Sequence, residues 1–84
     1  MTKVVKQFVP NIKFLNAISM TIKELRQQHN LTQEKLAAVS DIHWRTVQKV
    51  ERGAKNITVG LFYCFAKGFG LSPDELMLLV QKKM

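Results

Sequence analysis

The segment 44–52 carries the side chains with the clearest chemical potential in this chain. If it is helical, steps of about 100° per residue place Val47 and Val50 together on one face. The opposite face then carries an aromatic ring, an amide and three cations, which are Trp44, Arg45, Gln48, Lys49 and Arg52. The major groove of DNA admits a helix, and its base edges match the hydrogen-bonding groups of Arg, Lys and Gln. The pattern predicts a helix that buries two valines and offers its polar face to DNA.

Two kinds of DNA contact are expected from this region. We predict base contacts from Trp44, Arg45, Gln48 and Lys49, since Gln48 can bind adenine through two hydrogen bonds and the cations can bind guanine. For Trp44 two alternatives stay open, because its ring could contact thymine methyl groups or the DNA backbone, or could pack against its own domain. Backbone contacts, which position a protein without reading sequence, are expected from residues at or near the helix ends, namely Gln33, His43, Arg52 and Lys55.

Helices on either side must hold this segment in place. Apolar residues recur at steps of three and four from Ile12 through Leu25, which predicts a helix over 12–29 that Asn30 ends. Thr32 is a good N-cap for a short helix over 33–39. Asp41 is placed in the turn that follows, and Gly53 stops the helix over 44–52.

Two further helices complete the predicted fold. Thr58 caps one over 59–69, and the run from Ser72 to Glu75 is a capping box with proline at the first helical position of another over 73–82. Five predicted helices and the absence of a predicted strand indicate an all-α domain over residues 11–84. Residues 1–10 form an N-terminal arm that is either loosely ordered or packed on its own domain or on a second subunit.

Composition narrows the class of protein. The chain has 84 residues with 13 Lys and Arg against 6 Asp and Glu, a net charge of +7, which suits one small domain with a polyanionic partner. Nucleic acid fits better than a membrane surface, because the basic residues are spread over several helices. Cys64 is the single cysteine, so no disulfide within the chain is expected, and the absence of a signal peptide or long apolar run predicts a cytoplasmic location. We expect no metal, no cofactor and no enzymatic activity, since no ligand or catalytic spacing is present.

One acidic residue needs a partner. Glu51 borders the face of the predicted helix that carries the valines, where an unpaired carboxylate would be costly. We therefore expect a cation beside it, with Arg26 as the candidate.

The sequence from Ile22 to Leu76 resembles the lambda-repressor/Cro-like, or XRE, family of helix-turn-helix proteins. The resemblance is carried by five stretches, which are 22–26, 31–37, 47–53, 56–59 and 65–76. It implies a five-helix lambda-repressor-like domain in which Trp44, Arg45 and Lys49 occupy base-contacting positions and Gln33 is the glutamine that bridges phosphate and base. It also implies an ion pair between Arg26 and Glu51.

Two positions depart from the family pattern. Asp41 stands where the turn usually has glycine, and Trp44 stands where a small or polar residue is common, which affects how bases would be read. Within the family, residues 42–43, 50–53 and 56–58 are similar to the controller proteins of restriction–modification systems.

The expected function is that of a sequence-specific transcription regulator that binds a pseudo-palindromic operator in double-stranded DNA as a homodimer. Its two copies of helix 44–52 would lie about 34 Å apart, one turn of DNA. Apolar residues left over after the core is assigned are candidates for the dimer interface, namely Leu61, Tyr63, Met77, Leu78 and Met84. The alternative is an antitoxin or another protein-interaction module whose main partner is a protein.

Overall fold

The computed structural model describes residues 12–53 and 57–84, and all regular structure in these ranges is helical. The helices are α1 (Ile12–Gln28), α2 (Gln33–Ser40), α3 (Trp44–Gly53), α4 (Val59–Gly68) and α5 (Pro73–Gln81). Each lies within one residue of its predicted bounds, so the all-α prediction is confirmed. The predicted arm over residues 1–10 lies outside the described residues.

Short polar side chains start three of the helices. The Thr32 hydroxyl accepts a hydrogen bond from the Lys35 N–H at 3.0 Å, and Thr58 caps α4 in the same way. At α5 the Ser72 N–H donates to the Glu75 carboxylate at 2.8 Å while the Ser72 hydroxyl accepts from the Glu75 N–H at 3.3 Å. Because these bonds span only three residues, the caps could be predicted from the sequence.

Left-handed residues end two helices and set the angle of the next. Asn30 has a φ of 55° after α1, and Asp41 has a φ of 59° between α2 and α3. The Ile42 N–H donates to the Ala37 carbonyl at 3.0 Å, which closes the end of α2. Asp41 thus adopts the conformation that glycine provides more easily, at some cost in backbone strain.

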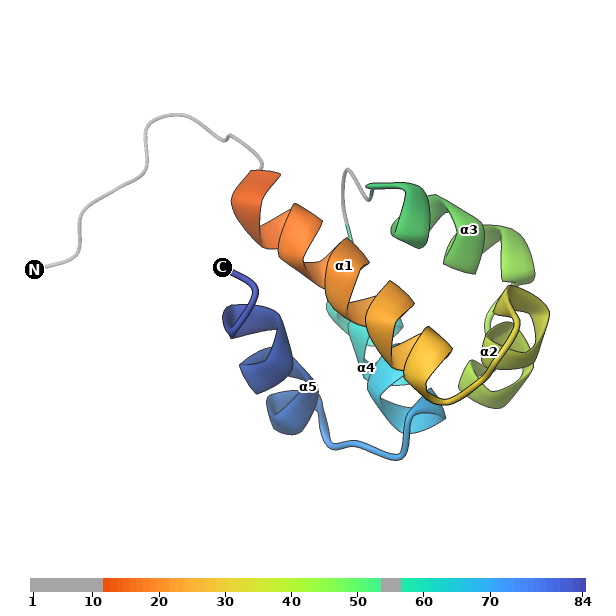
Figure 1. The fold of residues 1–84 in the computed structure, drawn as a ribbon. Helices are drawn as coiled ribbons and strands as arrows, with labels where there is room; N and C mark the ends of the chain where they lie inside the picture. The colour runs from red at the N-terminus through yellow and green to blue at the C-terminus, as the bar shows by residue number, and fades with distance from the viewer. Residues whose placement is uncertain (1–11, 54–56) are drawn as a thin grey trace, which may run out of the picture.

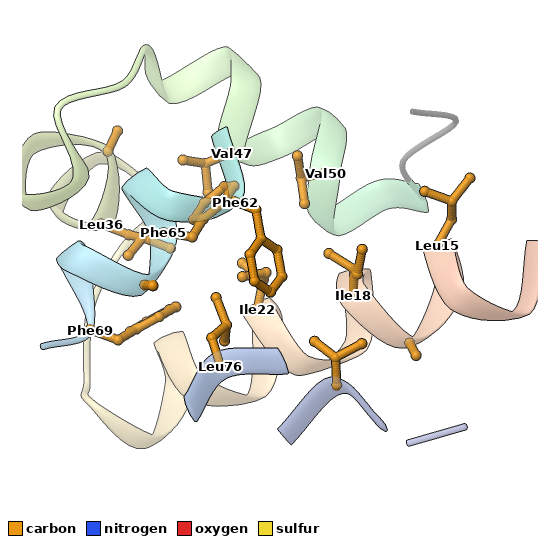
Figure 2. Packing of buried hydrophobic residues seen from close by; sticks show 14 residues of the cluster. Leu15, Ile18, Ile22, Leu36, Val47, Val50, Phe62, Phe65, Phe69 and Leu76 are labelled. Atoms are coloured by element: carbon orange, nitrogen blue, oxygen red, sulfur yellow. The ribbon is translucent and has the colours of Figure 1, made fainter. Parts of the chain in front are cut away.

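All five helices contribute to one hydrophobic core. Helix α1 contacts α3 on one side and α5 on the other, α2 contacts α3 and α4, and α4 contacts α5 (Figure 1). Ile18 and Ile22 of α1 lie at the centre of the cluster, where Phe65 of α4 is fully buried. Figure 2 shows these side chains packed with the two valines of α3. The core therefore fixes the orientation of α3 from its buried side.

The predicted apolar face of α1 is wrong at its first residue. Ile12 is 62 % exposed, whereas Leu15, one turn later, is buried. The first turn of α1 is covered only in part, since Phe14 is half-buried against the core while Ile12 is exposed, so helical periodicity alone overestimates the buried stripe. None of the helices in the described ranges is long and apolar enough to cross a membrane.

Helices α2 and α4 cross at close range. A Cβ atom built on Gly68 would lie 2.0 Å from the Ser40 Oγ atom and 3.1 Å from its Cβ atom. Ser40 is fully buried, and its hydroxyl has no hydrogen-bond partner among the described residues. The absence of a side chain at Gly68 is therefore required by the packing of α4 against the end of α2.

Candidate nucleic-acid interface

Helix α3 has the two faces that its sequence predicts. Val47 and Val50 are buried. On the other side Trp44, Arg45, Lys49 and Arg52 are exposed, and Gln48 is half-buried. We call this set of five residues the basic arc. The arc leaves three positive charges in solvent on one helix face, which suits a polyanion.

Trp44 lies on the surface at the start of α3. Its side chain is 38 % exposed and is not part of the core cluster. The ring stacks with His43, with centroids 6.4 Å apart and planes at 20°, and the Arg45 guanidinium carbon lies 5.9 Å from the Trp44 ring centroid. The tryptophan therefore contacts its neighbours in the chain and sits beside Arg45 on the basic arc.

His43 caps the first turn of α3. The Arg45 N–H donates to the His43 Nδ1 atom at 3.1 Å, so this nitrogen is the unprotonated acceptor of the ring. A backbone N–H at the start of α3 is thereby satisfied, and the exposed imidazole remains next to the basic arc.

Arg26 and Glu51 form the expected ion pair between α1 and α3. The Arg26 Nε and Nη2 atoms donate to the two Glu51 carboxylate oxygens at 2.6 and 3.0 Å. The Arg26 Nη1 atom also donates to the Leu31 carbonyl at 2.9 Å. The Arg26 side chain is only 15 % exposed and the Glu51 side chain only 4 %. The hydrogen bond to Glu51 raises the pKa of Arg26 above its ordinary value, and burial opposes this.

Gln33 joins the same network from the start of α2. Its Nε2 atom donates to the Glu51 Oε1 atom at 3.1 Å. Glu51 therefore holds side chains from both α1 and α2 against α3. This contact was missed in the sequence, because it joins residues 18 positions apart on different helices.

A polar hollow of about 290 Å³ opens beside this network, between α1, α2 and α3. Three cations, two amides and one carboxylate line it, namely Lys23, Arg26, Arg52, Gln33, Gln48 and Glu51. Sequence reasoning assigned no role to Lys23. Its position three residues before Arg26 was the available signal, since residues at this spacing lie on one side of a helix.

The five residues predicted for the dimer interface fall into two groups according to the exposure of their side chains. Tyr63, Leu78 and Met84 are exposed, whereas Leu61 and Met77 are half-buried and pack against the core. Met77 also lines an apolar groove of about 350 Å³ between the starts of α1, α4 and α5. Lys55, the remaining predicted contact, lies outside the described residues.

No group of three or more His, Cys, Asp or Glu side chains in the described ranges could hold a metal ion.

Comparison with known proteins places this geometry in a family. Residues 22–76 match the helix-turn-helix family model. The control protein C.BamHI of Bacillus amyloliquefaciens is 29 % identical over 68 residues, which cover 80 % of this chain and 82 % of the relative. The control protein C.SmaI of Serratia marcescens is 30 % identical over 60 residues, 71 % of either chain.

A solved structure agrees with the sequence matches. The crystal structure of the wild-type restriction–modification controller protein C.Esp1396I superposes with a TM-score of 0.76 at 27 % identity, covering 83 % of this chain and 91 % of that one. The chain therefore belongs to the XRE-type helix-turn-helix family of DNA-binding transcription regulators, with the controller proteins of restriction–modification systems among its relatives.

Proposed function

We propose that this regulator inserts α3 into the major groove of its operator and controls the genes of a restriction–modification system. The observation that carries the proposal is the division of α3, with two valines fixed in the core and the three cations of the basic arc exposed to solvent. The names of the relatives support the biological role, since they are control proteins. None of the matched proteins supports the antitoxin alternative.

The roles we assign within the arc follow from position and chemistry. Arg45 and Gln48 lie on the half of α3 nearest its N-terminus, the part that reaches base edges in helix-turn-helix complexes, and Lys49 follows one turn after Arg45. Trp44 presents an exposed apolar ring that can contact a thymine methyl group.

Backbone contacts would come from the margins of this surface. We assign them to Gln33, His43, Arg52 and Lys55. Gln33 lies at the first turn of α2, where backbone N–H groups have no partner within the helix and attract phosphate.

We also propose that the protein binds as a homodimer through α4 and α5. Val59 is 88 % exposed beside the apolar groove, and Tyr63, one turn further along α4, is exposed as well. Met77 lines the groove, and Leu78 is the exposed residue next to it on α5. Several exposed apolar side chains beside an apolar groove on a small domain are typical of a subunit contact.

Selection of bound sequences from random duplex DNA, at a stated salt concentration, tests the proposal. We expect a consensus with two-fold symmetry, because a symmetric dimer presents two copies of α3 to two half-sites. Recovery of no enriched sequence would contradict operator recognition, and an enriched site without symmetry would contradict the dimer.

Substitution of Arg45 then separates base contacts from backbone contacts. We expect Arg45→Ala to weaken binding to the selected sequence by about 1–3 kcal/mol more than binding to random DNA. Lys67→Ala, on the last turn of α4, removes the same charge away from the basic arc and serves as the control. Equal losses of affinity for the selected sequence and for random DNA would show that Arg45 contacts the DNA backbone and not a base.

Sedimentation equilibrium tests the dimer directly. Leu78→Glu places a charge on an exposed position of α5 and is expected to shift the protein toward the monomer. Val39→Glu, at an equally apolar exposed position on α2, should leave the mass unchanged. A Leu78→Glu variant that remains dimeric would exclude this face.

A further inference from the structure

We infer that the polar hollow between α1, α2 and α3 holds one phosphate of the DNA backbone, and that Lys23 of α1 is a ligand of that phosphate. The inference rests on the proposed function and adds a binding residue from outside the helix-turn-helix segment.

The charges around the hollow favour an anion. Glu51 is its only acidic side chain, and both of its oxygens are occupied by Arg26. Lys23 and Arg52 line the same hollow, are exposed, and have no ion-pair partner among the described residues. With three cations and one carboxylate, the hollow carries a formal charge of +2. An anion that enters it therefore meets two cations without competition from a carboxylate.

The neutral groups of the hollow are hydrogen-bond donors. Gln33 is held at the wall because one N–H of its amide donates to Glu51, which leaves the second amide N–H available. Gln33 is also the first residue of α2, where the backbone N–H has no partner within the helix. Charged side chains and free N–H groups together are the usual ligands of a DNA phosphate.

The position of the hollow selects the backbone of DNA as the source of this anion. Gln48 and Arg52 belong both to the basic arc and to the lining of the hollow. When α3 lies in the major groove, the hollow must therefore face the edge of that groove, where the phosphates run. Lys23 lies on α1, outside the basic arc, and lines the hollow. It acts there as a point charge without selecting a base.

Lys23→Gln tests the inference, with Lys67→Gln as a matched control that removes one exposed lysine from α4. Affinity for random duplex DNA is measured between 50 and 200 mM salt. Loss of one phosphate contact should reduce the slope of log affinity against log salt by about 0.9, so the wild type should lose about 3.5-fold more affinity than Lys23→Gln over this range. Lys23→Arg should restore the slope, because it keeps the charge.

Three results separate the outcomes. A slope for Lys23→Gln equal to that of Lys67→Gln and of the wild type would overturn the inference. A loss confined to the selected operator would also overturn it, because a phosphate contact weakens binding to all sequences alike. The proposed function is tested separately from these two outcomes: it fails if the wild-type protein shows no sequence preference in the selection. Lys23 is exposed and forms no ion pair with the other described residues, so circular dichroism should show an unchanged fold for Lys23→Gln.

Discussion

Removal of the Glu51 carboxylate is the change with the most direct structural consequence. In Glu51→Ala, Arg26 loses two charge-assisted hydrogen bonds and keeps its bond to the Leu31 carbonyl. Gln33 loses its acceptor as well. The guanidinium, only 15 % exposed, is left without a counter-charge.

The expected cost follows from these losses. Breaking a buried ion pair by removing one partner costs about 3–5 kcal/mol. Because Arg26 retains some access to water and one carbonyl, we expect the lower end, about 3 kcal/mol. A domain of this size has a free energy of unfolding of roughly 4–13 kcal/mol, so Glu51→Ala should lose a large part of it.

Urea denaturation followed by circular dichroism measures this loss. With a slope of about 1 kcal/mol per molar urea, the low end for small proteins, the midpoint should fall by about 3 M. A double variant, Arg26→Met with Glu51→Leu, removes both charges and supplies apolar groups of similar volume, so it should recover most of the stability. A Glu51→Ala protein within about 0.5 kcal/mol of the wild type would refute the reasoning, since it would mean that the pair contributes no more than an exposed one.

Three other substitutions test local features of the fold. Gly68→Ala should destabilise the protein by about 1–3 kcal/mol in urea denaturation, because the new methyl group overlaps Ser40, and a gain in stability from better helix propensity would contradict this. Asp41→Gly should raise the thermal midpoint by a few degrees by relieving left-handed strain of about 1 kcal/mol, and a lower midpoint would show that the carboxylate contributes more than the strain costs. Asp74→Asn should flatten the loss of stability below about pH 4. A hydrogen bond with Ser72 lowers the pKa of Asp74 in the folded protein, so the ionised form adds stability that is lost as the pH falls through that lowered pKa, and an unchanged acid profile would remove Asp74 as a contributor.

The sequence by itself determined the helices and their ends. The starts of α2, α4 and α5 could be predicted from their capping residues Thr32, Thr58 and Ser72, because a cap joins atoms only two or three residues apart. The alternation of valines with long polar residues likewise divided α3 into a buried face and the basic arc. These features depend on helical geometry and neighbouring residues, which a linear pattern contains.

Only the tertiary structure decided which side chains from different helices contact one another. The sequence suggested Arg26 as a partner for Glu51, but the packing of α1 and α2 against α3 brought Gln33 to the same carboxylate and Lys23 and Arg52 to the same hollow. Such contacts join positions that are distant in the chain, and their distances depend on how the whole core packs. For the same reason periodicity misplaced Ile12 in the core, since burial requires a neighbouring helix and helical spacing alone supplies none.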